Sequence, residues 1–341
     1  MFLYITVPFI ISFVGNVVSA LFSKKTGFFI DRVDSDKPQK VHKTPVPRIG
    51  GIGIFLGFFT GIFFFMENKD FVLGLFISSL PVFLTGLFED YHGNIPPKLR
   101  LVFMSVGAAL SVFTLNAVVN SIGFISFPFF IAVPFTIFAV VGIINAFNMV
   151  DGLNGLSSGL GIISLTFFSY VLYMVGDLEF FTLCVVLAGS LLGFFILNFP
   201  YGKIFLGDGG AYFLGFLMSV ISVLMVSRNP EISPWFPVVI LAYPIFDVLF
   251  AMFRRKFIQK TSPFSPDKLH LHSLIYKKIV RNNPLSSMFI FALSIPFDFM
   301  AVLFFDNTNV LFFLFVMFCL TYLLLYYYLS KNLIKRRVKL G

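Results

Sequence analysis

Residues 127–155 read FPFFIAVPFTIFAVVGIINAFNMVDGLNG, and this stretch contains both features that decide the fold. Its first part is an uncharged apolar run, and about 20 such residues are enough for a helix to cross a bilayer. Its second part places a polar residue at every third position, namely Asn145, Asn148, Asp151 and Asn154. Residues at this spacing lie along one face of a helix. The stretch therefore predicts a transmembrane helix that leaves the membrane with a polar face.

This polar face has two interpretations. One or two Asn and Gly residues at this point would form an ordinary helix end, where they serve as C-cap residues. Four polar groups on one stripe are more than a cap needs, and an ionisable residue next to the membrane interior marks function by default. We therefore predict that this segment contributes to a functional site.

The rest of the chain has the composition of a membrane protein. Of its 341 residues, 58% are hydrophobic and 12% are charged, whereas about a quarter are charged in a soluble protein. Runs of about twenty apolar residues differ from the ten-residue alternation of an outer-membrane barrel. The predicted fold is all-α, a polytopic integral membrane protein with one domain over 1–341 and about 11 transmembrane helices. The expected spans are 1–22, 49–66, 71–88, 101–119, 127–145, 158–175, 180–198, 211–227, 234–253, 286–305 and 310–329.

The basic residues predict the orientation of these spans. With this set of spans, 23 of the 25 Lys and Arg residues fall on one side, and only Lys69 and Arg228 fall on the other. Cytoplasmic loops carry such an excess of Lys and Arg. The N-terminus is therefore expected outside and the C-terminus in the cytoplasm. No motif supports nucleic-acid binding, and the net charge of +9 is explained by topology and by attraction to anionic lipid.

Acidic residues also gather at the predicted cytoplasmic ends of the helices: Glu89, Asp90, Asp151, Asp208 and Asp247. Carboxylates bind Mg²⁺, which is usually shared with substrate phosphates. Carboxylates on the side richest in Lys and Arg therefore predict a site for a metal ion and a polyphosphate. The site is expected in the cytoplasmic loops 23–48, 89–100, 146–157, 199–210 and 254–285.

Several of these segments have an ordinary structural alternative. Asp208 lies among Gly207, Gly209 and Gly210, where the backbone can approach a ligand closely, but it would also serve as a helix N-cap. The Glu89-Asp90 pair can hold one acid as a base or can belong to a solvated loop. His270 and His272 could bind phosphate or metal, but the residues alone favour an ordinary polar role in a loop. The basic loop before Gly50 either holds a lipid phosphate or only sets the topology.

Taken in order, the segments resemble the polyprenyl-phosphate N-acetylhexosamine-1-phosphate transferases, such as the undecaprenyl-phosphate GlcNAc-1-phosphate transferases. These enzymes share a superfamily with the phospho-N-acetylmuramoyl-pentapeptide translocases. The resemblance covers roughly 31–275. The segments that carry it are Asp36–His42, Pro45–Gly51, Glu89-Asp90, Asn145–Gly155, Asp208 and His270-Leu271-His272. The Pro-Val-Pro-Arg-Ile-Gly-Gly form of Pro45–Gly51 favours the hexosamine branch over the pentapeptide translocases.

The resemblance implies a role for each matching residue. Asp208 would bind Mg²⁺, with Mn²⁺ as an alternative ion, and Asp90 would be the essential acid, with Glu89 beside it. Asp151 would belong to the catalytic set, in the uridine and metal region. The implied substrate-binding residues are Lys40, His42, Arg48, Lys98, Asn145, Asn148, Gly152, Asn154, Arg254, His270 and His272. Two departures weaken single assignments: the family usually has Asp where Glu89 stands, and His where Ser273 stands.

The implied reaction transfers N-acetylhexosamine-1-phosphate from a UDP-sugar to undecaprenyl phosphate and releases UMP, as the first membrane step of a cell-surface polysaccharide such as O-antigen. The expected location is the bacterial cytoplasmic (inner) membrane, with the active site on the cytoplasmic face. The alternatives are a pentapeptide translocase-type transferase and, in a different class, a transporter or flippase. The latter would place charges at mid-membrane depth, where only Asp298 lies. The sequence leaves the sugar, the pathway and the oligomeric state open, with a homodimer as one alternative.

Overall fold

The computed structural model describes residues 2–31, 45–262, 267 and 269–338. In these ranges nearly all regular structure is helical, and one short two-stranded sheet pairs Ile30–Asp31 with Val46–Pro47. The elements are α1 (Phe2–Thr26), β1 (Ile30–Asp31), β2 (Val46–Pro47), α2 (Gly50–Phe65), α3 (Lys69–His92), α4 (Pro97–Leu115), α5 (Phe129–Val150), α6 (Leu156–Met174), α7 (Leu178–Asn198), α8 (Gly207–Arg228), α9 (Trp235–Ile240), α10 (Ala242–Phe253), the π-helical turn η1 (Arg254–Ile258), α11 (Leu271–Ile275), the π-helical turn η2 (Tyr276–Val280), α12 (Asn283–Leu303) and α13 (Thr308–Val338). The all-α prediction is confirmed.

Nine helices of the described ranges are long and apolar enough to cross a membrane: α1, α3 to α8, α12 and the first part of α13. The predicted count of eleven is not confirmed, because two expected spans take other forms. Helix α2 has 16 residues, which is about 24 Å of helix against roughly 30 Å of hydrocarbon. The expected continuous helix over 234–253 is wrong, since it is interrupted at Leu241 between α9 and α10. Pro244 explains the interruption, because it has no N–H to donate to the carbonyl group of Ile240.

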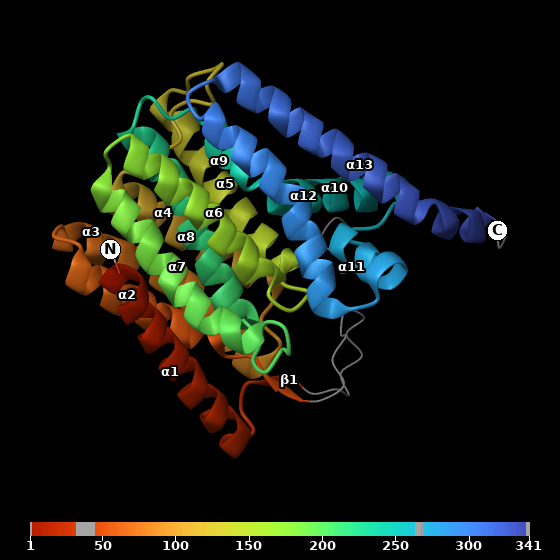
Figure 1. Cartoon of the computed structure of the whole chain (residues 1–341), viewed down its shortest axis with the longest axis horizontal. Coiled ribbons are helices and arrows are strands. Elements are labelled where there is room, and N and C mark those ends of the chain that lie inside the picture. Colours follow the sequence, from red (N-terminus) through yellow and green to blue (C-terminus); the bar gives the residue numbers. More distant parts are fainter. Residues whose placement is uncertain (1, 32–44, 263–266, 268, 339–341) are drawn as a thin grey trace.

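Helix α8 lies at the centre of the bundle (Figure 1), and 89% of the residues in its apolar 18-residue stretch are buried. It packs against α2, α3 and α5, and α1 packs at the outside against α2 and α7. Helices α12 and α13 lie at the opposite edge of the molecule from α1. Because α8 is surrounded by other helices, its first residues lie where the ends of several helices meet.

The outer surface of the bundle is apolar. Large aromatic side chains such as Phe64, Phe113, Phe130 and Phe138 are each about 70% exposed (69%, 74%, 74% and 73%). Exposed apolar surface of this extent on many sides is unfavourable in water and marks contact with lipid. The fold is therefore that of a multi-pass membrane protein.

Several helix ends near the acidic residues differ from the sequence prediction. Helix α3 runs to His92, so Glu89 and Asp90 lie in its last turns rather than in a loop. Helix α5 ends at Val150, so the polar stripe is helical only for its first part. The apolar segment 116–128 is not helical and contains an isolated bridge between Ser121 and Ser126.

Candidate active site

The carboxylate of Asp90 caps helix α8 from the neighbouring helix α3. Its Oδ1 accepts the backbone N–H of Asp208 at 2.9 Å, and its Oδ2 accepts that of Gly209 at 2.9 Å. The side chain is 1% exposed. The first N–H groups of a helix have no partner within the helix and favour a negative charge. Asp90 accepts two of these N–H groups and supplies the negative charge. The structural alternative for Asp208, an N-cap of α8, is therefore wrong: Asp208 belongs to the first turn of α8, and Asp90 does the capping.

Glycines allow α3 and α8 to approach this closely. Gly207 has φ +76°, and a Cβ there would lie 2.5 Å from Oδ2 of Asp90. A Cβ on Gly86 of α3 would lie 2.4 Å from the Cα of Gly209. A larger residue at either position would push the carboxylate away from the helix end. The glycines around Asp208 therefore serve a backbone contact between helices.

Arg48 connects the two aspartates. Its Nη2 lies 3.4 Å from Oδ1 of Asp90 and 3.5 Å from Oδ1 of Asp208. The backbone at Arg48 pairs with Phe205, whose N–H donates to Pro47 O at 2.8 Å. Burial acts to lower the pKa of Arg48, but the charges of Asp208 and Asp90 outweigh burial and hold it above its usual range. Arg48 is therefore a fixed cation next to two acids.

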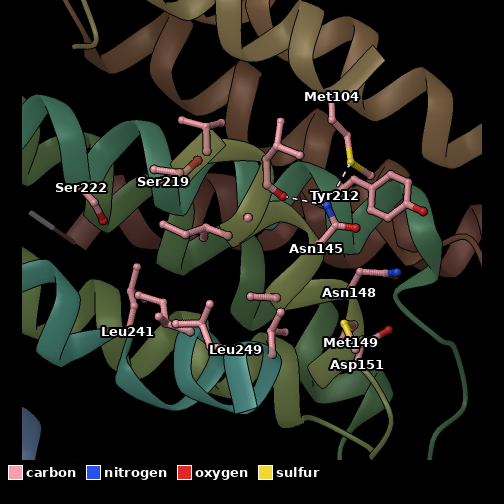
Figure 2. A pocket seen from close by; sticks show the side chains of 18 of the residues that line it. Met104, Asn145, Asn148, Met149, Asp151, Tyr212, Ser219, Ser222, Leu241 and Leu249 are labelled. Carbon is pink, nitrogen blue, oxygen red and sulfur yellow. Dashed lines mark hydrogen bonds between the residues drawn. The ribbon is translucent and has the colours of Figure 1, made fainter. Parts of the chain in front are cut away.

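The predicted stripe of α5 faces a cavity of about 2080 Å³, and Arg48 and Asp208 line the same cavity. Asn145, Asn148 and Asp151 line it as well (Figure 2). Asn154 lines it too, but from the loop after α5, where its side chain donates to Pro200 O at 2.9 Å. The expectation of a helix through Asn154 is wrong, because α5 ends before Gly152 and Gly155.

Asp151 has an unusual proton affinity. Burial raises its pKa to about 7, and Asp208 acts in the same direction, whereas Arg48 opposes the rise. Because the charges of Arg48 and Asp208 both act on the pKa of Asp151, the three residues interact electrostatically. Acids from α3, α5 and α8 thus meet at one end of the bundle, as the sequence predicts.

Glu89 and Arg100 form a second charged pair on the cavity wall. Arg100 Nη1 lies 3.7 Å from Oε1 of Glu89 and donates to the hydroxyl group of Tyr212 at 3.2 Å. All three residues line the cavity. The predicted substrate contact Lys98 is exposed instead. Residues two apart on a helix do not face the same side, so α4 turns Arg100 toward the site and Lys98 away from it.

The two predicted histidines are buried and line the cavity. His270 Nδ1 lies 2.6 Å from Oδ2 of Asp247. His272 Nδ1 lies 3.2 Å from the hydroxyl group of Tyr243, and a Cβ on Gly152 would lie 3.0 Å from His272 Nε2. Burial lowers the pKa of His272 to about 4, so it is neutral near pH 7. The interpretation of these histidines as merely polar loop residues is wrong.

The basic segment after α10 contributes one arginine to the cavity. Arg255 lines the cavity, whereas Arg254 donates to Leu269 O at 2.7 Å, to Asp267 Oδ2 at 2.6 Å and to Tyr326 OH at 3.0 Å. Sequence reasoning selected Arg254 and missed Arg255. Neighbouring residues of a helix point about 100° apart, and nothing in the Arg254-Arg255-Lys256 triplet indicates which one faces inward.

The cavity continues from this polar end into an apolar part. Leu241 and Leu249 line that part, away from Asn148 and Asp151 (Figure 2). Ser219 and Ser222 line it too, but their hydroxyl groups donate to backbone carbonyl groups of α8 at 2.7 Å. Two other predicted contacts, Lys40 and His42, lie outside the described residues. Asp298 of α12 is 2% exposed, and nothing in the structure explains it.

The residues present fit a magnesium ion that is shared with a substrate. Among the described residues no group of three or more His, Cys, Asp or Glu side chains is arranged to hold a metal ion by itself. Mg²⁺ commonly uses only one or two carboxylates together with substrate phosphates. Asp208 and Asp151 line the same cavity, and the charge of Asp208 acts on Asp151. Both oxygens of Asp90 already accept backbone N–H groups. A bound Mg²⁺ would neutralise phosphate charge here, held by Asp208 and Asp151.

Comparison with known proteins adds a family. The model of glycosyl transferase family 4 matches residues 72–226. An undecaprenyl-phosphate alpha-N-acetylglucosaminyl 1-phosphate transferase of Thermotoga maritima is 34% identical over 270 residues, covering 79% of this chain and 80% of the relative. The chain belongs to glycosyl transferase family 4. The resemblance seen in the sequence motifs is thereby confirmed.

Two more relatives show a similar degree of identity. A decaprenyl-phosphate N-acetylglucosaminephosphotransferase of Mycobacterium leprae is 33% identical, with 71% of this chain and 69% of the relative covered. An undecaprenyl-phosphate alpha-N-acetylglucosaminyl 1-phosphate transferase of Escherichia coli O157:H7 is 31% identical, with 78% and 74% covered. The family 4 segment contains Asp90, Asp151 and Asp208, whereas Arg48 and both histidines lie outside it.

Proposed function

We propose that the protein transfers N-acetylhexosamine-1-phosphate, with N-acetylglucosamine as the favoured sugar, from its UDP derivative to undecaprenyl phosphate. The names of the relatives support the lipid and the sugar. The observation that carries the proposal is the meeting of Arg48, Asp151 and Asp208 at the polar end of one cavity. Charges of both signs at one point suit a diphosphate that reacts beside a membrane.

The reaction needs alignment and charge neutralisation more than covalent chemistry from the protein. An oxygen atom of the lipid phosphate attacks the β-phosphorus atom of the UDP-sugar, the bond from this phosphorus to the bridging oxygen breaks, and UMP leaves. Arg48, Arg100 and Arg255 line the cavity and are placed to balance the phosphate charges. Asp208 and Asp151 would hold the Mg²⁺ ion, and the apolar part of the cavity would take the first prenyl units.

The membrane orientation is part of the proposal. The end that carries Asp90, Asp151 and Asp208 is proposed to face the cytoplasm at the inner membrane of a bacterium. The excess of Lys and Arg in the segments on this side supports it. Helix α1 leads into β1 and β2 at this end, so the N-terminus would lie outside.

The test is UMP release by the purified protein in nanodiscs with undecaprenyl phosphate, Mg²⁺ and a panel of UDP-sugars. We expect release with UDP-N-acetylglucosamine or another UDP-N-acetylhexosamine, and its loss with EDTA. Asp208→Asn should lower kcat at least 100-fold. Asp70→Asn is the matched control, because Asp70 is an exposed acid at the opposite end of α3 from Asp90.

Two outcomes would contradict the proposal. Release of UMP only with UDP-N-acetylmuramoyl-pentapeptide would assign the protein to the translocase branch. No release with any UDP-sugar, by protein that keeps a cooperative melting transition, would remove the transferase function.

A further inference from the structure

Asp247, His270 and Arg255 form a buried chain of hydrogen bonds that ends at the cavity. Asp247 is completely buried, His270 is 3% exposed and Arg255 is 2% exposed. His270 Nδ1 lies 2.6 Å from Asp247 Oδ2, and His270 Nε2 lies 3.1 Å from Arg255 Nη2. Asp247 lies in α10, Arg255 lies in η1, and His270 comes directly before α11. The chain therefore joins two segments that are separated in sequence.

The partners of His270 determine its tautomer. An arginine guanidinium group only donates hydrogen bonds, so His270 Nε2 must accept from Arg255. The proton of the neutral ring then lies on Nδ1 and is donated to Asp247. In this state neither ring nitrogen of His270 is available as a donor to a phosphate. The geometry thus differs from the direct substrate contact that the sequence resemblance implies for His270.

Arg255 is held from two sides at the cavity wall. Its Nε donates to Asp267 Oδ2 at 3.2 Å, and its Nη2 donates to His270. A planar guanidinium group that is fixed in this way binds phosphate oxygens without first losing side-chain freedom. Its neighbour Arg254 is directed to Leu269, Asp267 and Tyr326 instead.

We propose that Asp247 and His270 are positioning residues that hold Arg255 against the diphosphate of the nucleotide sugar. The inference rests on the proposed function, since it takes a UDP-sugar as the ligand. Asp247 fixes the tautomer of His270, His270 offers a lone pair to Arg255, and Arg255 contacts the ligand. His270 and Arg255 then act as one unit, so that the loss of either removes the same binding interaction.

A double-mutant cycle tests this coupling. The dissociation constant of UDP is measured by calorimetry on the full-length protein in detergent, for wild type, His270→Ala, Arg255→Ala and the double variant. We expect each single variant to raise Kd about tenfold and the double variant to raise it no further than Arg255→Ala alone. Independent effects that multiply to about a hundredfold would overturn the proposal, because His270 would then contact the ligand itself.

Conservative variants keep the test valid if His270→Ala does not fold. Gln places an oxygen near the position of Nε2 and can still accept from Arg255, whereas Asn keeps only the contact with Asp247. His270→Gln should bind UDP within about threefold of wild type, and His270→Asn should be as weak as Arg255→Ala. Equal Kd values for the two variants would contradict the proposal.

Asp247→Asn tests the tautomer. The amide group of Asn can donate to Nδ1 and move the ring proton to Nε2, which would then face the N–H of Arg255. We expect a rise in Kd similar to that of His270→Ala. Tyr322→Phe is the control, because it removes only the hydrogen bond from Tyr322 OH to Asp247 Oδ1 and should leave Kd within twofold. Wild-type affinity in Asp247→Asn would overturn the proposed role of Asp247.

The design separates this inference from the proposed function. Wild-type protein that binds UDP but releases no UMP would remove the transferase function, while the cycle on Kd would still decide the coupling. Protein that binds no UDP at millimolar concentration would overturn both.

Discussion

The side chain of Asp90 accepts the backbone N–H of Asp208 at 2.9 Å, and these two residues lie 118 positions apart on helices α3 and α8. The contact fixes the first turn of α8, from which the carboxylate of Asp208 reaches Arg48. Asp90 is itself 1% exposed. The acid that family resemblance places at the reacting phosphates therefore acts, in this geometry, on the position of Asp208.

Asp90→Asn tests this positioning role. Asn keeps one acceptor oxygen but turns an NH₂ group toward a backbone N–H, and loss of a charge-assisted hydrogen bond costs about 1.5–3 kcal/mol. We expect a melting temperature lower by several degrees and a Mg²⁺ concentration for half-maximal activity at least tenfold higher. Thermal melts and Mg²⁺ titrations of UMP release measure both, with Asp70→Asn as the control. A variant that loses activity with an unchanged melting temperature and Mg²⁺ requirement would place Asp90 at the reacting atoms.

The sequence alone is enough to predict that acids from separate helices meet at one end. The penalty for ionisable groups in lipid limits where such residues can lie, so hydropathy by itself restricts Asp90, Asp151 and Asp208 to helix ends. The orientation of the Asp90 side chain cannot be predicted in this way, because it depends on the contact of Gly86 with Gly209, which joins distant parts of the chain.

Hydropathy also could not give the local geometry of the loops and the broken helix. An average over 234–253 stays apolar whether or not Pro244 interrupts the hydrogen bonds, so the window predicts one helix. The choice between Arg254 and Arg255 depends on the rotation of one helical turn, which no spacing rule defines. Side chains that are adjacent in sequence can thus have separate roles, one in the cavity and one in the surrounding structure.

Arg100 and Lys98 offer a direct comparison of two cations on one helix. Arg100 contacts Tyr212 and faces Glu89 at the cavity, whereas Lys98 is exposed. Arg100→Gln should lower kcat/KM for the UDP-sugar at least tenfold, about 1.4 kcal/mol of transition-state stabilisation. Lys98→Gln should change it less than twofold. Steady-state UMP release at varied UDP-sugar checks both variants, and the opposite order of effects would show that the rotation of α4 is wrong.

The raised pKa of Asp151 predicts that the stability of the folded protein depends on pH. Burial raises the pKa of Asp151 to about 7 from an ordinary value of 3.8, so the folded state keeps a proton that the unfolded state loses. Stability attributable to this group therefore falls as pH rises from about 4 to 7 and is constant above 7. Asp151→Asn removes this loss, so its melting temperature should exceed that of wild type by more at pH 8 than at pH 5.

Melts between pH 5 and 8 in detergent measure the difference, and the change over this range corresponds to at most about 3 kcal/mol. Saturating Mg²⁺ and UDP-N-acetylglucosamine serve as the control, since a bound cation would stabilise the ionised Asp151 and raise the wild-type melting temperature at pH 8. A difference between variant and wild type that is the same at both pH values would contradict the raised pKa.

The contact between α2 and α8 gives the last prediction. A Cβ on Gly51 would lie 2.5 Å from the backbone nitrogen of Gly210, and backbone atoms cannot move aside as a side chain can. Gly51→Ala should therefore destabilise the protein by about 1–3 kcal/mol and lower activity at least tenfold, because Asp208 lies two residues from Gly210.

Gly142→Ala is the stability control, because a Cβ there meets nothing within 4 Å. Ala favours the helix by up to about 1 kcal/mol, so the melting temperature of this variant should equal or exceed that of wild type. Since the two substitutions add the same methyl group, a similar melting temperature for both would mean that α2 and α8 do not approach each other in the native protein, and that the position of Asp208 does not depend on their contact.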